Sequence, residues 1–233
     1  MANKLVLSVG AAAAMCFAGA ANAQLSWTNS LSGTWIDIST TGTALNLSDD
    51  GEVNIASTSS NAVFGAGARV GSNGAVRFGG SGLNLVFTNQ TIPSTSMFGG
   101  DQSLAVFWDD INTSSGANGN IYWENVGSTL VVQWERAGFF GSQDTVTFQL
   151  QVHSSGASLA QFLYRDVTSA RANTGGSATI GYQDGGVGFG DAQFSFNTAG
   201  AVSNGLVLSL VPAPGAAVLL GLGGLVATRR RRD

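Results

Sequence analysis

The stretch TVTFQLQV, residues 145–152, decides the fold class, because apolar and polar side chains alternate along its whole length. Successive side chains of a β-strand point to opposite faces, so the apolar residues share one face and the Thr and Gln residues share the other. We therefore predict a half-buried strand whose apolar face meets the core and whose Gln149 and Gln151 face solvent.

The same two-residue period recurs along the middle of the chain, between turns rich in Gly, Asn, Asp and Ser. Further strands are expected near residues 51–57, 62–70, 74–79, 83–87, 104–108, 121–124, 130–135, 160–164, 177–183, 192–196 and 205–210. No helix of convincing length is expected between Gln24 and Leu210. This pattern favours an all-β fold, a two-sheet antiparallel β-sandwich.

The N-terminus has the layout of a secretory signal peptide: Lys4, an apolar run over residues 5–20, and the small residues Ala21 and Ala23. We expect a signal helix that signal peptidase removes after Ala23. Cys16 is the only cysteine of the chain. The mature protein would therefore have no disulfide, no cysteine nucleophile and no thiolate metal site.

A second apolar segment covers residues 211–228 and is followed by Arg229, Arg230, Arg231 and Arg232. Its length is near the lower limit of roughly 17 residues for a helix that spans a bilayer. Terminal arginines favour the cytoplasmic side of a membrane. The sequence thus predicts a transmembrane helix; a terminal core strand followed by a solvated run of charge is the alternative.

The order of a short Pro motif, an apolar helix and an arginine cluster resembles the PEP-CTERM sorting signal of exported bacterial proteins. The motif consists of Pro212, Ala213, Pro214 and Gly215, with Ala213 where the family has Glu. The resemblance implies a membrane-anchored intermediate, cleavage by an exosortase-type processing enzyme, and delivery to the cell surface or extracellular matrix. We expect a signal peptide over residues 1–23, a β-sandwich domain over 24–211 and a sorting tail over 212–233.

The expected domain is strongly acidic. Residues 24–211 contain five basic and 13 acidic residues, a net charge of −8, and no lysine. Such a charge repels nucleic acids and anionic lipids, so a phosphate-binding role is excluded. It also favours the solubility of an extracellular domain.

Several stretches of the middle region occur in an order typical of one known module: LNLSDDGEVNI (45–55), RVGSNGAVRFGG (69–80), LAVFWDDINTSSG (104–116), GNIYWENVGSTLVVQWER (119–136), TVTFQLQVHSSG (145–156) and ATIGYQDG (178–185). Together they resemble the nidogen-type extracellular β domain, the NIDO-like module of exported bacterial proteins, over about residues 45–185. The resemblance implies an adhesive or matrix component and names no reaction.

Two acidic turns offer hard oxygen ligands of the kind that calcium prefers. The first contains Asp109, Asp110 and Asn112, and the second contains Asp49, Asp50 and Glu52. The spacing of the first turn is not that of an EF-hand. The alternative is that these side chains cap turns by accepting bonds from nearby backbone N–H groups. Apart from a calcium ion, no cofactor is expected.

Catalytic groups are few. A glycosidase needs two carboxyl groups roughly 5–9.5 Å apart, and Glu124 and Glu135, with Asp109, are the candidates beside aromatic residues. Both glutamates fall on polar strand faces, where surface charge is the ordinary explanation. His153 is the only histidine and is expected to be a solvated residue at a strand end.

Four of the five tryptophans divide into two groups. Trp123 and Trp134 lie on apolar strand faces and are expected in the core, whereas Trp27 and Trp35 lie in a polar N-terminal region and are better candidates for exposed contacts.

These observations favour a non-enzymatic surface or matrix protein with a structural or adhesive role, whose partners are exopolysaccharide or surface proteins. A carbohydrate-binding module, with or without calcium, is the alternative, and a glycan hydrolase is the least favoured.

Overall fold

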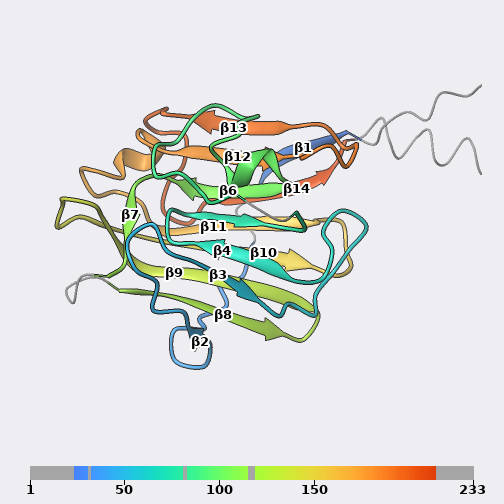
Figure 1. Ribbon diagram of the computed structural model, residues 1–233, viewed down its shortest axis with the longest axis horizontal. Coiled ribbons are helices and arrows are strands. Elements are labelled where there is room, and N and C mark those ends of the chain that lie inside the picture. The colour runs from blue at the N-terminus through green and yellow to red at the C-terminus, as the bar shows by residue number, and fades with distance from the viewer. Residues whose placement is uncertain (1–23, 31–32, 81–82, 115–118, 214–233) are drawn as a thin grey trace, which may run out of the picture.

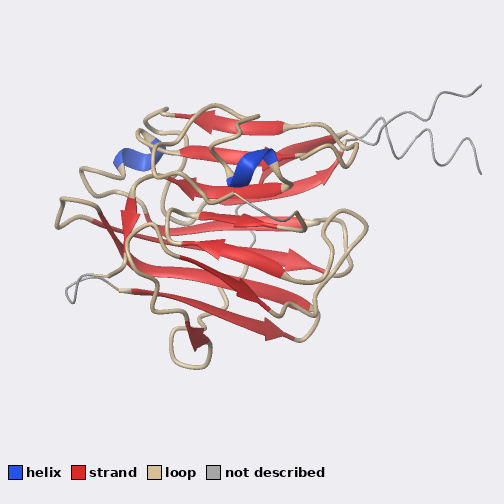
Figure 2. Ribbon diagram, viewed as in Figure 1, coloured by secondary structure: helices blue, strands red, loops and turns tan. Residues whose placement is uncertain are grey.

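The computed structural model describes residues 24–30, 33–80, 83–114 and 119–213, which form an antiparallel β-sandwich (Figure 1). Besides strands, these residues form two 3-10 turns, η1 (Phe98–Gly100) and η2 (Asn173–Gly175) (Figure 2). The predicted all-β, two-sheet class is therefore confirmed. The predicted signal helix and transmembrane helix lie outside the described residues. None of the helices that are described is long and apolar enough to cross a membrane.

The larger sheet has eight strands in the order β1-β14-β11-β10-β9-β8-β2, with β7 paired to β9. Its strands are β1 (Leu25–Ser30), β2 (Thr43–Ala44), β7 (Ile111–Asn112), β8 (Asn120–Val126), β9 (Thr129–Phe139), β10 (Thr145–His153), β11 (Ala160–Asp166) and β14 (Val207–Pro212). The smaller sheet has six strands in the order β13-β12-β6-β5-β4-β3. They are β3 (Glu52–Ile55), β4 (Ala68–Gly71), β5 (Ala75–Arg77), β6 (Ser103–Trp108), β12 (Thr179–Gln183) and β13 (Ala192–Phe196).

Aromatic side chains join the inner faces of the two sheets. Phe107 of β6 stacks on Phe148 of β10 with ring centroids 5.6 Å apart, and Phe148 stacks in turn on Trp134 of β9 at 4.8 Å. All three side chains are fully buried. Trp123 packs against the same core while remaining partly exposed. The prediction that Trp123 and Trp134 serve the core is confirmed.

Side chains also tie the two sheets together at their lateral ends. At one end the indole N–H of Trp27 donates to the carbonyl of Ala192 in β13 at 2.7 Å, and its ring packs on Phe162 at 4.7 Å. At the other end the backbone N–H of Thr58 donates to the side chain of Asn125 in β8 at 3.2 Å. Trp27 is therefore a structural residue, not the exposed contact residue that the sequence suggested.

The outer face of the larger sheet is covered by backbone. Gln149 and Gln151 are 0% and 3% exposed, so the prediction of a half-buried strand with these side chains in solvent is wrong. Residues 33–42, here called the strap, cross this face and bond to polar side chains of β8, β9 and β10. The Gln residues on this face of β10 therefore form hydrogen bonds with another stretch of backbone and not with water.

The outer face of the smaller sheet is covered as well. The strand expected near residues 83–87 is instead part of a loop that carries Leu85 onto this face. There Leu85 packs with Phe98 and with Trp108 of β6 in a small second core. The apolar residues of this loop are spaced to contact the face of a sheet. A two-residue period by itself does not show whether such a segment packs on a sheet or pairs as one of its strands.

Candidate functional site

The strap holds its residues in fixed positions over the larger sheet. Gln151 donates from Nε2 to the carbonyl of Thr34 at 2.9 Å, and Gln149 donates from Nε2 to the carbonyl of Ile36 at 2.7 Å. Trp35 lies between these two anchored residues. Its backbone is thus fixed on both sides, as binding residues need.

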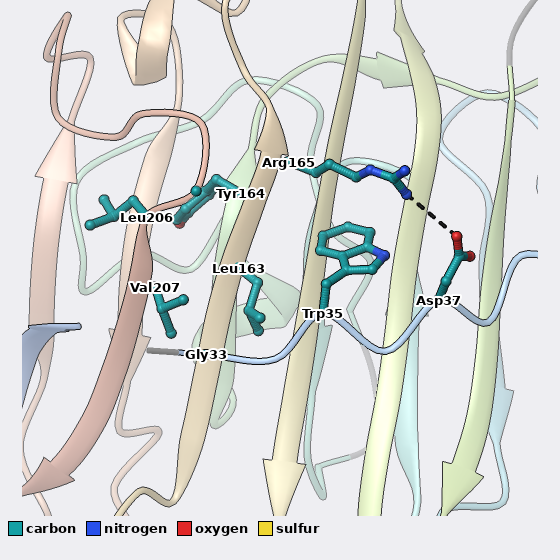
Figure 3. Close-up of a pocket in the computed structure, with 9 residues that line it drawn as sticks. Gly33, Trp35, Asp37, Leu163, Tyr164, Arg165, Leu206 and Val207 are labelled. Carbon is teal, nitrogen blue, oxygen red and sulfur yellow. Dashed lines mark hydrogen bonds and ion pairs between the residues drawn. The ribbon is translucent and has the colours of Figure 1, made fainter. Parts of the chain in front are cut away.

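A pocket of about 380 Å³ opens where the strap passes over β11 and β14. It is lined by Gly33, Trp35, Asp37, Leu163, Tyr164, Arg165, Gly205, Leu206 and Val207. Figure 3 shows Trp35, Asp37 and the Arg165 guanidinium together on one side of the pocket and the aliphatic side chains on the other. Its volume lies within the range of about 300–1,000 Å³ that is typical of small-molecule sites.

A cation, an anion and an aromatic ring meet on this side of the pocket. The guanidinium of Arg165 lies 5.5 Å from the ring centroid of Trp35 and 3.4 Å from the carboxylate of Asp37. The side chains of Arg165 and Asp37 are 53% and 49% exposed. The hydroxyl of Ser39, which donates to Asp37 at 2.7 Å, is the main cause that lowers the pKa of Asp37 to about 2. Asp37 is therefore ionised throughout the physiological range.

The sequence singled out Trp35 but neither Asp37 nor Arg165. Asp37 and Arg165 are 128 residues apart, and only the pairing of distant strands brings them together. The one local signal was an acidic residue on the same strand-like face as Trp35, two positions along the chain.

A second cluster of candidate residues forms where the two acidic turns lie next to each other. Asp49, Asp50 and Asp110 place carboxylate oxygens within 4.8 Å of one another. Asp50 accepts a bond from the side chain of Asn73 at 2.8 Å, and the buried Oδ1 of Asp49 has no hydrogen-bond partner among the residues described. Asn112 caps its own turn by accepting from the backbone N–H two residues later at 2.8 Å.

Burial and neighbouring like charges together determine the electrostatics of this cluster. Burial is the largest cause that raises the pKa of Asp110, and the charges of Asp49 and Asp50 raise it further. The pKa of Asp49 is raised by burial and by Asp50. Oxygen groups of this kind could hold a calcium ion, with Asp110 contributing from one turn and the other two from the second.

The other acidic candidates hold the fold together. Asp109 is 3% exposed, accepts a bond from the Ser177 hydroxyl and pairs with Arg171 at 3.5 Å. Burial raises its pKa. Glu52 forms an ion pair with Arg69. The structure therefore gives both carboxylates partners of their own, and the charge of Asp109 also raises the pKa of the neighbouring Asp110.

The carboxylates considered for glycan hydrolysis are widely spaced. Glu135 lies opposite Asn120, and Glu124 is four residues further along β8 on the same face. At about 3.3 Å per residue the backbone positions of the two glutamates are roughly 13 Å apart along the strand, whereas the carboxyl groups of a glycosidase pair are roughly 5–9.5 Å apart. His153 is half-buried at the end of β10, with Nδ1 3.2 Å from the hydroxyl of Thr129.

The comparison with known proteins concerns the whole sandwich. A family model described as NIDO related matches residues 26–216, from β1 to beyond β14. The chain belongs to the NIDO-related family. The NIDO-related match supports an extracellular β domain and is wider than the predicted range of residues 45–185. Neither the search of curated proteins nor the search of solved structures found a match. The PEP-CTERM tail stays a prediction.

Proposed function

We propose that this NIDO-related chain is an exported, non-catalytic component of a bacterial cell surface or extracellular matrix, with a structural or adhesive role. The observation that carries the proposal is the pairing of β1 with β14, which places Leu25 opposite Pro212. The N–H of Ala213 donates to the carbonyl of Gln24 at 2.7 Å. The described part of the sandwich thus starts just after the expected signal-peptide cleavage point and reaches the start of the expected tail (Figure 1).

This boundary favours removal of both terminal segments. Cleavage after Ala23 removes no residue of β1, and cleavage beyond Ala213 removes no residue of β14. Pro212 belongs to β14 itself, so an exosortase-type enzyme would act on the remainder of the motif, with Pro214 and Gly215. The product would be an intact sandwich delivered to the surface, where exopolysaccharide or surface proteins are the proposed partners.

Cell fractionation tests the sorting step. Full-length protein should pass through a membrane fraction as a longer species and accumulate at the surface as a shorter one. A chain lacking residues 214–233 should go directly to the medium. Replacing Arg229, Arg230, Arg231 and Arg232 with lysines keeps the charge and should preserve sorting, whereas replacing them with glutamines should impair it. Identical export of full-length and truncated chains would contradict the proposal.

Polysaccharide binding is the second candidate, and the pocket beside Trp35 is the observation that favours it. Glycan hydrolysis is the least favoured, because Glu124 and Glu135 lie on well-separated strand positions and their carboxylates already accept bonds from Thr41 and Gln133. If the protein nevertheless hydrolysed a glycan, Glu124→Gln should abolish that activity; unchanged turnover would exclude this pair.

A further inference from the structure

We infer that the pocket beside Trp35 binds a neutral sugar residue of a polysaccharide chain. This inference rests on the second candidate function above and specifies its ligand.

One wall suits the carbon face of a sugar ring. Leu163, Leu206 and Val207 line the pocket with aliphatic surface, and Trp35 faces them across it (Figure 3). Sugar rings carry C–H groups on their faces, and these are buried favourably against aliphatic and aromatic surface. A ligand with hydroxyl groups on its edge and C–H groups on its face fits a pocket with one apolar side.

The other wall suits adjacent hydroxyl groups. Arg165 supplies N–H donors, and Asp37, 3.4 Å away, supplies carboxylate acceptors. A pair of neighbouring hydroxyls can accept from the first and donate to the second, so both charges keep partners when water is displaced. A wholly apolar peptide side chain would desolvate the same pair and replace none of its hydrogen bonds. This wall therefore favours a sugar over an apolar peptide.

The charge of the domain selects a neutral sugar. Arg165 and Asp37 neutralise one another locally, and residues 24–211 carry a net charge of −8. An anionic polysaccharide would be repelled by this field. A neutral glycan is bound without that penalty.

The pocket is already formed without a ligand. The carbonyls of Thr34 and Ile36 are bonded to β10 on either side of Trp35. The indole Nε1 of Trp35 is buried and has no partner among the described residues. Arg165 lies over this ring with its guanidinium 5.5 Å from the ring centroid, and its side chain is half exposed beside Asp37. A rigid site loses little conformational entropy on binding.

Binding of neutral hexasaccharides by the full chain in detergent tests the inference. The probes are cellohexaose, maltohexaose and chitohexaose, with oligogalacturonate as the anionic comparison, measured by titration calorimetry. At least one neutral probe should bind saturably and oligogalacturonate should not. Arg165→Gln should weaken binding about tenfold, as expected for losing a charged hydrogen bond. Trp35→Ala should weaken it at least as much.

Matched variants elsewhere on the surface separate this site from general effects. Phe140→Ala removes another exposed aromatic ring and Arg136→Gln another exposed guanidinium; both should bind as the wild type does. If Trp35→Ala fails to fold, Arg165→Gln decides alone. No saturable binding of any neutral probe, or wild-type affinity in Arg165→Gln, would overturn the inference. Such a result would not contradict the proposal of surface sorting, because that proposal is tested separately by cell fractionation.

Discussion

The side-chain amide of Gln149 bonds to both backbone groups of Ile36. Its Oε1 accepts from the Ile36 N–H at 3.3 Å, and its Nε2 donates to the Ile36 carbonyl at 2.7 Å. One glutamine of β10 thus binds the strap as a neighbouring strand would. Because a buried backbone group must find a partner, this contact couples the strap to the sheet.

Replacing Gln149 with Met should therefore destabilise the protein. Methionine has a similar shape but leaves the N–H and carbonyl of Ile36 without their partner, a loss of about 1–3 kcal/mol. Chemical denaturation measures the change. Gln143→Met, at an exposed turn residue, is the matched control and should leave the unfolding free energy unchanged. Equal stability of the two variants would mean that the strap is not coupled to folding.

The strands themselves were predictable, whereas the solvent exposure of their faces was not. In β9 and β10 the two-residue period located both strands, and it placed Trp134 and Phe148 correctly in the core. The same period placed Gln149 and Gln151 in solvent, yet both are buried. A strap of backbone offers donors and acceptors just as water does, so sequence polarity cannot distinguish the two surroundings.

The pocket and the acidic cluster depend on strand order, which local sequence does not reveal. Trp35 was a candidate because its neighbours are polar, but its partner Arg165 is supplied by the end of β11. Asp110 meets Asp49 and Asp50 because the turns after β6 and before β3 lie together. No period or motif records which strands become neighbours across such distances.

Gly33→Ala should destabilise the strap next to the pocket. A Cβ atom at this position would lie 2.5 Å and 2.8 Å from the two γ-carbons of Val207 and 3.2 Å from Leu163. Such overpacking costs about 1–3 kcal/mol, measured as a fall in unfolding free energy. Gly65→Ala is the control, because a Cβ there meets nothing within 4 Å. If Gly33→Ala is as stable as Gly65→Ala, the strap is free to move away from β14.

The ionised Asp37 side chain should stabilise the folded protein, and this contribution should be lost at acid pH. Its folded-state pKa is about 2, lowered first by the Ser39 hydroxyl, against an ordinary value of 3.8. A carboxyl group whose pKa is lowered by folding stabilises the folded state at any pH above its ordinary pKa. This contribution is lost as the pH falls from about 3.8 toward 2. The contribution is small because the side chain is half exposed.

Thermal melting of Asp37→Asn and the wild type between pH 2 and 7 measures this effect. The variant should melt lower at pH 7, and the difference should shrink as the pH falls from about 3.8 toward 2. Ser39→Ala removes the main cause of the lowered pKa and should change stability in the same direction. A difference that is constant with pH would show that Asp37 acts through contacts rather than through its charge.

Asp110→Asn should raise the melting temperature in calcium-free buffer at pH 7. The pKa of Asp110 is raised by burial and by Asp49 and Asp50, and a raised carboxyl pKa means that ionisation destabilises the folded state. This penalty is absent at low pH and grows as the pH rises above the ordinary value of 3.8. Since solvent screens the cluster, we expect a rise of roughly 1–3 °C.

Calcium and a control variant complete this test. Millimolar calcium should raise the melting temperature of the wild type, because a bound cation offsets the repulsion and stabilises the folded state by mass action. Asp110→Asn has one carboxylate fewer and should gain less. Asp166→Asn, at an exposed aspartate at the end of β11, should match the wild type with and without calcium. If Asp110→Asn melts with the wild type in chelator and shows the same calcium response, the three carboxylates neither repel one another measurably nor bind the ion.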